Sequence, residues 1–273
     1  METILMPTDF SHAADNACKY AIELAKYFNA RIILVHAYSM PITGADSGFA
    51  MNLNLDLKND AERKLNEIRE GIQKNSDNPE VACYTGLGSV HEVIKDAAKQ
   101  FDADFIVMGI IGKAGAIKEH LIGSSAVTVA RNIELPVFII PQEASFHPIK
   151  KISFACNMND PDEISLMPVV KHFNKVFDAE LEVVNVEKPE EEVTLEKARA
   201  NLFIEEKLTY IKHHTVFITE RNVAVGLEHY YNVHPTDLII LSPKKHNILY
   251  RLFNESVTKE LAFHSNTPIL SIH

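Results

Sequence analysis

The chain has 273 residues, of which 46% are hydrophobic and 23% charged, and this balance predicts a soluble globular protein rather than a disordered one. Its length suits two ordinary domains. The net charge of −10 is shared by both halves, with −6 on residues 1–144 and −4 on residues 145–273, so no clustered basic surface for nucleic acid is indicated.

The first predicted elements form a strand, a helix and a second strand. Residues 3–6 are a short apolar run that predicts a buried strand, and Pro7-Thr8-Asp9-Phe10-Ser11 follows it. Ser11 is a typical N-cap, and small and apolar residues recur at helical spacing from there to Phe28. Residues 31–37 are almost continuously apolar, which is typical of a strand covered on both faces in a parallel sheet.

A long connection and a third strand come next. Residues 39–57 include a proline and two glycines and lack a clear period, so they predict a polar loop, with a charged helix over residues 59–75. Residues 81–85 predict the third strand. Ser89 and Glu92 then give the Ser-x-x-Glu pattern of a capping box, which begins the next predicted helix.

The first half closes with two more strands and a helix. Residues 104–108 predict a fourth strand, residues 125–132 a helix and residues 136–140 a fifth strand. Strands and helices thus alternate, and this order predicts an α/β fold with a parallel, doubly wound sheet and right-handed crossovers.

A glycine-punctuated stretch follows the fourth strand. It runs from Met108-Gly109 through Gly112-Lys113 to Gly123-Ser124-Ser125. Glycines leave backbone N–H groups unhindered and a helix start adds further donors, so the stretch is typical of an anion cradle that binds phosphate. The alternative is that the glycines only allow a tight exit from the strand and an ordinary start of the helix.

The same order of elements returns after Pro141, as an internal repeat. Residues 104–108 align with residues 237–241 in this repeat. The second copy predicts strands over residues 151–155, 180–186, 215–219, 237–241 and 268–272, and helices over residues 163–177, 194–213, 223–233 and 256–264. We therefore predict two domains, residues 1–144 and residues 145–273, each with its own five-stranded sheet.

Together, Pro7-Thr8-Asp9-Phe10-Ser11, Gly109-x-x-Gly112 and Gly123-Ser124 resemble the universal stress protein family. The resemblance spans the chain as a tandem form with two copies. It implies an adenine nucleotide alpha hydrolase-like fold with strand order 3-2-1-4-5 and, in some members, ATP bound between strands 1 and 4, where ligands of open α/β sheets generally bind. It also implies pairing through the fifth strands, here an intramolecular pseudo-dimer that covers two sheet edges, and it leaves a further homodimer open.

The resemblance also implies nucleotide-binding roles for individual residues. Asp9 would lie on the ribose and adenine side, where hydroxyl donors need an acceptor, with the alternative that it only caps the entry to the helix. The remaining implied positions shape the pocket, present backbone to the adenine or face the phosphates, and they are Pro7, Thr8, Ala37, Met108, Gly109, Gly112, Lys113, Gly123, Ser124 and Ser125. Mg²⁺ could accompany the nucleotide.

Two departures from the family pattern affect this expectation. Ten residues separate Gly112 from Gly123 where the family has nine, and Gly115 gives the loop freedom to absorb the insertion, so we expect binding to be retained. In the second copy, Asn157, Ser242 and Glu255 stand where the first copy has Asp9, Gly109 and Gly123. A carboxylate at the start of a helix opposes phosphate, so we expect no ATP in the second half.

Other sequence features limit the range of functions. Cys18, Cys83 and Cys156 are widely separated, which indicates neither a disulfide framework nor a metal clip. No leader and no apolar run of about 20 residues is visible, so we expect a cytoplasmic protein without membrane association. The thirteen histidines contain no HExxH motif, and no metal site is predicted.

The sequence favours a binding protein over an enzyme, because it contains no Walker motif and no GxSxG elbow. Three hypotheses follow. The chain is an adenine-nucleotide sensor that acts in the stress response through an unknown protein partner, a nucleotide-independent interaction protein, or a weak ATPase.

Overall fold

The computed structural model describes residues 1–40, 47–110, 124–158, 160–187, 189, 202–243 and 266–273. In the first half the strands are β1 (Thr3–Pro7), β2 (Arg31–Tyr38), β3 (Val81–Leu87), β4 (Phe105–Ile110) and β5 (Val137–Pro141), and the helices are α1 (His12–Phe28), α2 (Ser47–Gln73), α3 (Val90–Phe101) and α4 (Ser124–Asn132). In the second half the strands are β6 (Lys151–Ala155), β7 (Glu180–Glu187), β8 (His213–Thr219), β9 (Leu238–Leu241) and β10 (Ile269–Ser271), and the helices are α5 (Pro161–Ile164), α6 (Met167–Phe177) and α8 (Val223–Val233).

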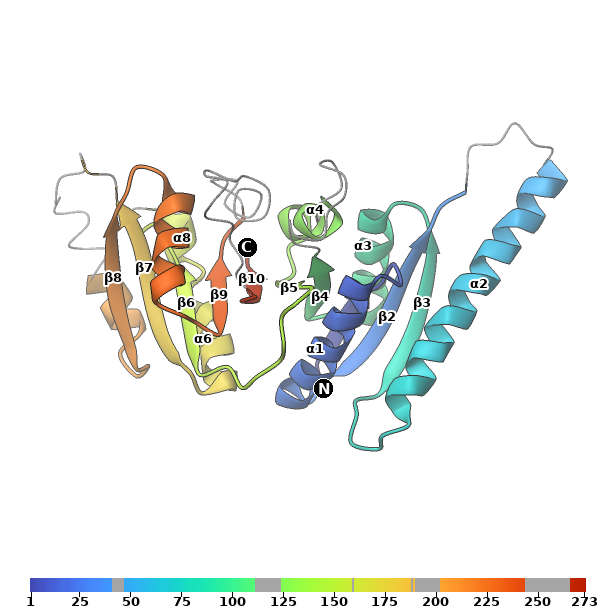
Figure 1. The fold of residues 1–273 in the computed structure, drawn as a ribbon, viewed down its shortest axis with the longest axis horizontal. Coiled ribbons are helices and arrows are strands. Elements are labelled where there is room, and N and C mark those ends of the chain that lie inside the picture. The colour runs from blue at the N-terminus through green and yellow to red at the C-terminus, as the bar shows by residue number, and fades with distance from the viewer. Residues whose placement is uncertain (41–46, 111–123, 159, 188, 190–201, 244–265) are drawn as a thin grey trace.

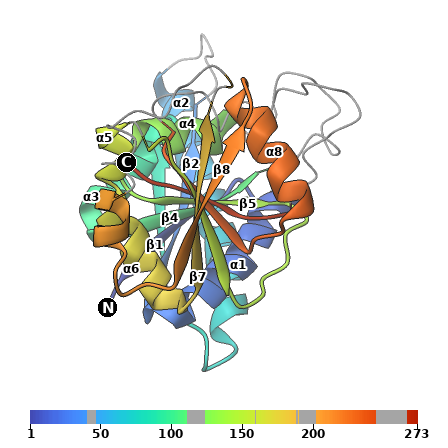
Figure 2. The same ribbon diagram turned by 90° about the vertical axis from the view of Figure 1, so that its left-hand side faces the viewer.

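The ten strands of the described residues form one sheet, in the order β3-β2-β1-β4-β5-β10-β9-β6-β7-β8 (Figure 1). Each half therefore has the predicted order 3-2-1-4-5 with parallel neighbours. The fifth strands of the halves, β5 and β10, pair antiparallel, with Leu270 opposite Phe138. The expected pairing of these two edges is confirmed. The strands fan about the long axis because of the strong twist of the sheet (Figure 2).

Helices cover both faces of the sheet. The apolar cluster on one face contains residues of α1, α2 and α6, and the cluster on the other face contains residues of α3, α4 and α8. Both clusters extend across the junction of the halves. At this junction Phe28 of α1 lies edge-on against Phe173 and Phe177 of α6, with ring centroids 5.7 and 5.5 Å apart. None of the described helices combines the length and apolar character that crossing a bilayer requires.

The prediction of a polar loop over residues 39–57 is wrong for most of that stretch. Helix α2 begins at Ser47 and extends to Gln73, so the helix is twelve residues longer at its start than the predicted 59–75. Apolar residues alternate with polar ones in this stretch, which hides the helical period. Met51 and Leu55 are exposed, whereas Leu65 is fully buried against the sheet, so only the later turns show a clear amphipathic pattern.

Two helix boundaries of the second half also differ from the prediction. The predicted helix over residues 163–177 is divided into α5 and α6, because Pro168 has no N–H to continue the helix from Ile164. The helix predicted to reach His213 ends earlier, since the described helical residues are 202–207 and His213 begins β8. The helix predicted over residues 256–264 lies outside the described residues, and the domain boundary at residue 144 stays a prediction.

One row of side chains distinguishes the two half-sheets. The row across β1, β2 and β3 is apolar and consists of Leu5, Ile33 and Ala82. The corresponding row across β6, β7 and β8 consists of Ser153, Glu182 and His214. The second half thus places a carboxylate inside a sheet whose first copy is apolar there.

Glu182 is only 1% exposed and is held by three neighbours. Its Oε1 accepts hydrogen bonds from the Tyr230 hydroxyl and from His214 Nε2, each at 2.9 Å, and Lys151 Nζ lies 3.3 Å away. Burial raises the pKa of Glu182, but these hydrogen bonds and the positive charge of Lys151 outweigh burial and leave the pKa below its ordinary value of 4.5. The ionised carboxylate is therefore the form that stabilises the fold.

Because the pKa of Glu182 is lowered on folding, its stabilising contribution is present above pH 4.5 and is lost as the pH falls through the lowered value. Glu182→Gln should lower the free energy of unfolding by about 1 to 2 kcal/mol at pH 7, and the difference from wild type should shrink towards pH 4. Urea unfolding between pH 7 and pH 4 measures this, with the half-exposed Glu180→Gln as control. A difference that stays constant over this range would contradict the expectation.

Candidate functional site

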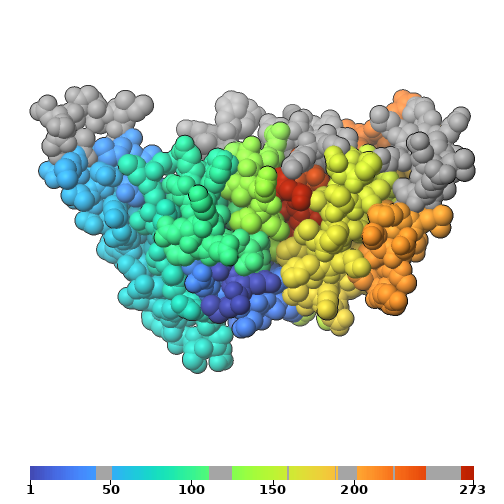
Figure 3. Space-filling model, turned by 180° about the vertical axis from the view of Figure 1, so that it is seen from behind, coloured from blue at the N-terminus to red at the C-terminus, as the bar shows by residue number. Residues whose placement is uncertain are grey.

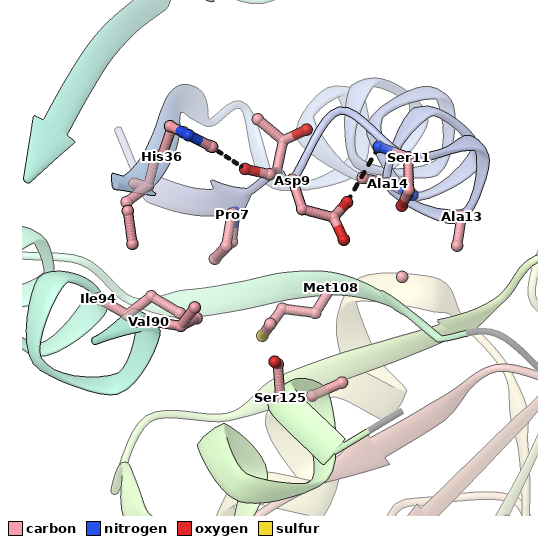
Figure 4. A pocket seen from close by; sticks show the side chains of 15 residues that line it. Pro7, Asp9, Ser11, Ala13, Ala14, His36, Val90, Ile94, Met108 and Ser125 are labelled. Carbon is pink, nitrogen blue, oxygen red and sulfur yellow. Dashed lines mark hydrogen bonds between the residues drawn. The ribbon is translucent and has the colours of Figure 1, made fainter. Parts of the chain in front are cut away.

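A cavity of about 350 Å³ lies at the carboxyl ends of β1, β2 and β4 (Figure 4). Strand β1 lies between β2 and β4, so the cavity is at the point where the strand order reverses, which is the usual ligand site of such sheets. Seven predicted site residues line it, namely Pro7, Thr8, Asp9, Ala37, Met108, Gly109 and Ser125. The other described lining residues are Ser11, Ala13, Ala14, Val35, His36, Val90, Ile94 and Ala126.

The turn after β1 is fixed by hydrogen bonds to its own side chains. Phe10 N–H donates to Thr8 Oγ1 (3.0 Å), Ser11 N–H donates to Asp9 Oδ1 (3.0 Å), and Ala14 N–H donates to Ser11 Oγ (3.3 Å). Ser11 therefore is the predicted N-cap of α1. Asp9 supports the turn with one carboxylate oxygen, and its second oxygen can accept hydrogen bonds from a ligand.

Phe10 holds the turn in an unusual backbone conformation. Its φ is +62°, in the left-handed region that residues with a Cβ rarely adopt. The Phe10 ring packs on His36, with centroids 4.4 Å apart, and Lys64 Nζ of α2 lies 5.3 Å from the Phe10 ring centroid. His36 Nδ1 carries the proton, because it contacts the carbonyl oxygen of Thr8 at 2.7 Å and a carbonyl can only accept. These contacts compensate for the local strain beside the cavity.

Gly109 lets the first turn of α1 approach β4. A Cβ at this position would overlap Ala13 O, lie 2.5 Å from Ala13 C and lie 3.0 Å from Ala14 N. Strand β4 also continues to Ile110, so Gly109 lies inside the strand and not at its end as predicted. Position 109 therefore requires glycine because the backbones of α1 and β4 pack closely there, whether or not Gly109 also contacts a ligand.

The opposite wall of the cavity is the start of α4. This helix begins at Ser124, and Ser125 in its first turn lines the cavity. The N–H groups of a first helical turn have no partners within the helix and carry partial positive charge. Figure 4 shows the carboxylate of Asp9 and the hydroxyl of Ser125 pointing into the cavity from opposite sides.

The charge of the described lining is negative. Asp9 is the only Asp, Glu, Lys or Arg among the described residues that surround the cavity. An anionic group would be repelled from Asp9 and attracted to the start of α4, whereas hydroxyl groups would be suited to Asp9. The arrangement thus suits a ligand with a hydroxyl-bearing part and an anionic part at opposite ends.

Some predicted site residues cannot be placed. Gly112, Lys113 and Gly123 lie outside the described residues, as do the extra residue between the glycines and the side chain of Ser124. Sequence reasoning also missed several lining residues, including His36, Val90 and Ala126. His36 directly precedes the predicted Ala37, and Val90 follows the capping residue Ser89. Their positions at the carboxyl end of a strand and in the first turn of a helix are the sequence signals that could have identified them as lining residues.

The corresponding turn of the second half contains an additional carboxylate. Asn157, which aligns with Asp9, donates its backbone N–H to Glu163 Oε2 at 2.6 Å, and Glu163 is buried. Burial, and then the negative charges of Glu163 and Asp160, raise the pKa of the Cys156 thiol well above its ordinary value. The turn after β6 is therefore an unfavourable environment for an anion.

Comparison with known proteins gives consistent relatives over about half of the chain. Residues 1–141 match the model of the "Universal stress protein family". A universal stress protein of Methanocaldococcus jannaschii is 29% identical over 139 residues, which cover 50% of this chain and 80% of that protein. Universal stress protein G of Salmonella typhimurium is 27% identical over 146 residues, covering 51% of this chain and 98% of that protein.

A solved structure extends the likeness to the whole chain. The crystal structure of a universal stress protein from Archaeoglobus fulgidus has a TM-score of 0.70 to this fold at 16% identity. The alignment covers 99% of this chain and 95% of that chain. At this identity the likeness concerns the fold alone, and it includes both halves.

Proposed function

The chain belongs to the universal stress protein family, and from this premise we propose that its first half binds ATP or another adenine nucleotide and that the protein acts as a cytosolic regulator in the stress response. The observation that carries the proposal is the cavity at the point where the strand order reverses, with Asp9 on one side and the start of α4 on the other.

A nucleotide matches the two ends of this cavity. Its ribose hydroxyls are donors for the free oxygen of Asp9, and its phosphates are suited to the unpaired N–H groups of the first turn of α4. The apolar side chains of Val35, Ile94 and Met108 supply a surface for the flat base. Lys113 and Gly123 would then complete the phosphate side, as the sequence predicts.

The second half is proposed to bind no nucleotide. Glu163 brings a buried carboxylate to the turn that corresponds to Asp9, and in the sequence Glu255 directly precedes the helix predicted over residues 256–264, whose start would receive phosphate. Two negative groups would oppose a polyphosphate. We assign this half, residues 145–273, a supporting role.

The protein is proposed to act by binding and not by turnover. The described lining provides Asp9 as its only carboxylate, and Asp9 already accepts the N–H of Ser11. We expect no saturable release of phosphate from ATP. Release that saturates with ATP and disappears in Gly123→Val would instead support the weak ATPase hypothesis.

Calorimetric titration with ATP and Mg²⁺ tests the proposal. The wild type should bind one ATP per chain, and Gly123→Val should bind none, because a branched side chain would displace phosphate from the backbone N–H groups. Thermal unfolding of both proteins serves as the control that the variant is folded. Equal affinity of wild type and variant would exclude a phosphate-binding role for the glycine-punctuated stretch. The nucleotide-independent interaction protein would then be the better hypothesis.

A further inference from the structure

Helix α4, whose first turn borders the cavity, is held at its other end by the second half of the chain. The carbonyl oxygen of Ala130 accepts a hydrogen bond from His273 Nε2 at 2.7 Å, and Ser271 Oγ donates to the same oxygen at 3.4 Å. Ser271 ends β10, and His273 follows it. One donor thus ends the strand that pairs with β5 across the junction, and the other lies two residues beyond that strand.

The Ala130 carbonyl needs such a partner. The last four carbonyl groups of an α-helix have no N–H donor within the helix, and α4 ends at Asn132. Ile133 N–H donates to Val129 O at 3.0 Å, and the Asn132 side-chain amide donates to Thr128 O at 2.7 Å. The second half supplies the corresponding donor for the buried Ala130.

Apolar packing connects the same elements. Val127, Val129 and Ala130 of α4 belong to one buried cluster with Ile269 of β10 and Leu241 of β9. Figure 3 shows the red residues of the C-terminal segment directly beside the yellow-green residues of α4. A nine-residue helix is about 13 Å long and rigid, so a hold on its last turn also fixes the direction of its first turn.

We propose that the second half positions α4 for nucleotide binding and that His273 is the positioning residue. This inference rests on the proposed function of the first half. The Nε2–H of His273 caps the last turn of α4, and the cap keeps the N–H groups at Ser124 and Ser125 directed into the cavity. The copy without a nucleotide site thereby contributes to the site of the other copy.

The test is a titration with ATP of wild type, His273→Ala, His273→Gln and the control His147→Ala. His273→Ala should bind ATP about threefold to tenfold more weakly, because a hydrogen bond to a buried carbonyl is lost. The side-chain amide of glutamine is about as far from its Cα as Nε2 is in histidine and can donate to Ala130 O. His273→Gln should therefore bind ATP with most of the wild-type affinity. The His147 ring is hydrogen-bonded to Ser145 O and to Asp237 and not to Ala130 O, so His147→Ala should bind like wild type.

Each alternative outcome is distinct. Equal affinity of wild type and His273→Ala would overturn this inference alone, even if the melting temperature of the variant is lower. A loss in His273→Ala that His273→Gln does not relieve would assign the effect to packing and overturn the capping role. No binding by the wild type would overturn the proposed function, and this inference with it.

Discussion

Replacing Gly109 by alanine is expected to lower the free energy of unfolding by about 3 kcal/mol, which for a chain of this length lowers the melting temperature by about 5 °C. The added Cβ would overlap the carbonyl group of Ala13 and crowd Ala14 N. Both neighbours are backbone atoms of the first turn of α1, so no side chain can turn away to make room. The turn must shift from β4, and it carries Ser11 and Ala14 of the cavity wall with it.

Gly71→Ala is the matched control. Gly71 lies in α2, and a Cβ there would meet nothing within 4 Å. Alanine has the higher helix propensity, so this change should leave stability unaltered or raise it by up to about 1 kcal/mol. Chemical unfolding of the three proteins gives the comparison. Equal stability of Gly109→Ala and wild type would show that the close approach of α1 and β4 is not required.

Removal of the Asp9 carboxylate is expected to weaken ATP binding about 10- to 100-fold, because a hydrogen bond to a charged group contributes about 1.5 to 3 kcal/mol. Asp9→Ala loses both the acceptor for the ligand and the acceptor for Ser11 N–H. Asp9→Asn keeps an oxygen for Ser11 N–H but loses the charge, so its affinity should lie between wild type and Asp9→Ala. Calorimetric titration measures all three.

Asp15→Ala is the control for charge alone. Asp15 is an exposed acid in the first turn of α1 and does not line the cavity. Asp15→Ala removes one negative charge from the same region, as Asp9→Ala does. The comparison therefore separates the effect of a direct contact between Asp9 and ATP from the effect of long-range repulsion between a carboxylate and the phosphates. If Asp9→Ala and Asp15→Ala both bind ATP like wild type, Asp9 does not bind the nucleotide. Its role is then only to cap the entry to α1, which is the alternative stated from the sequence.

The strands were predictable because each of them is a short apolar run. β1, β2 and β4 are buried on both faces, and this leaves an almost continuous hydrophobic signal. The early turns of α2 gave no such signal, because their apolar residues Met51 and Leu55 are exposed. A helix shows a period of apolar residues in its sequence only where one of its faces is buried.

The site was predictable in part for a related reason. Asp9 and Ser125 belong to motifs that can be read along the chain, and the structure brings them to opposite walls of one cavity. His36 and Ile94 have no motif and reach the cavity only through strand order and helix packing. The packing reason for Gly109 was equally hidden, since Ala13 is 96 residues away in the sequence.

The most direct test of nucleotide binding by the first half is the amount of adenine nucleotide that the chain carries. The protein is purified without added nucleotide and denatured, the released small molecules are identified by chromatography, and the apo protein is titrated with ATP. We expect one adenine nucleotide per chain, bound in the first half. Two per chain would contradict the assignment of Glu163 and Glu255 to a site that excludes nucleotide, and none, with no heat at millimolar ATP, would contradict the proposed function itself.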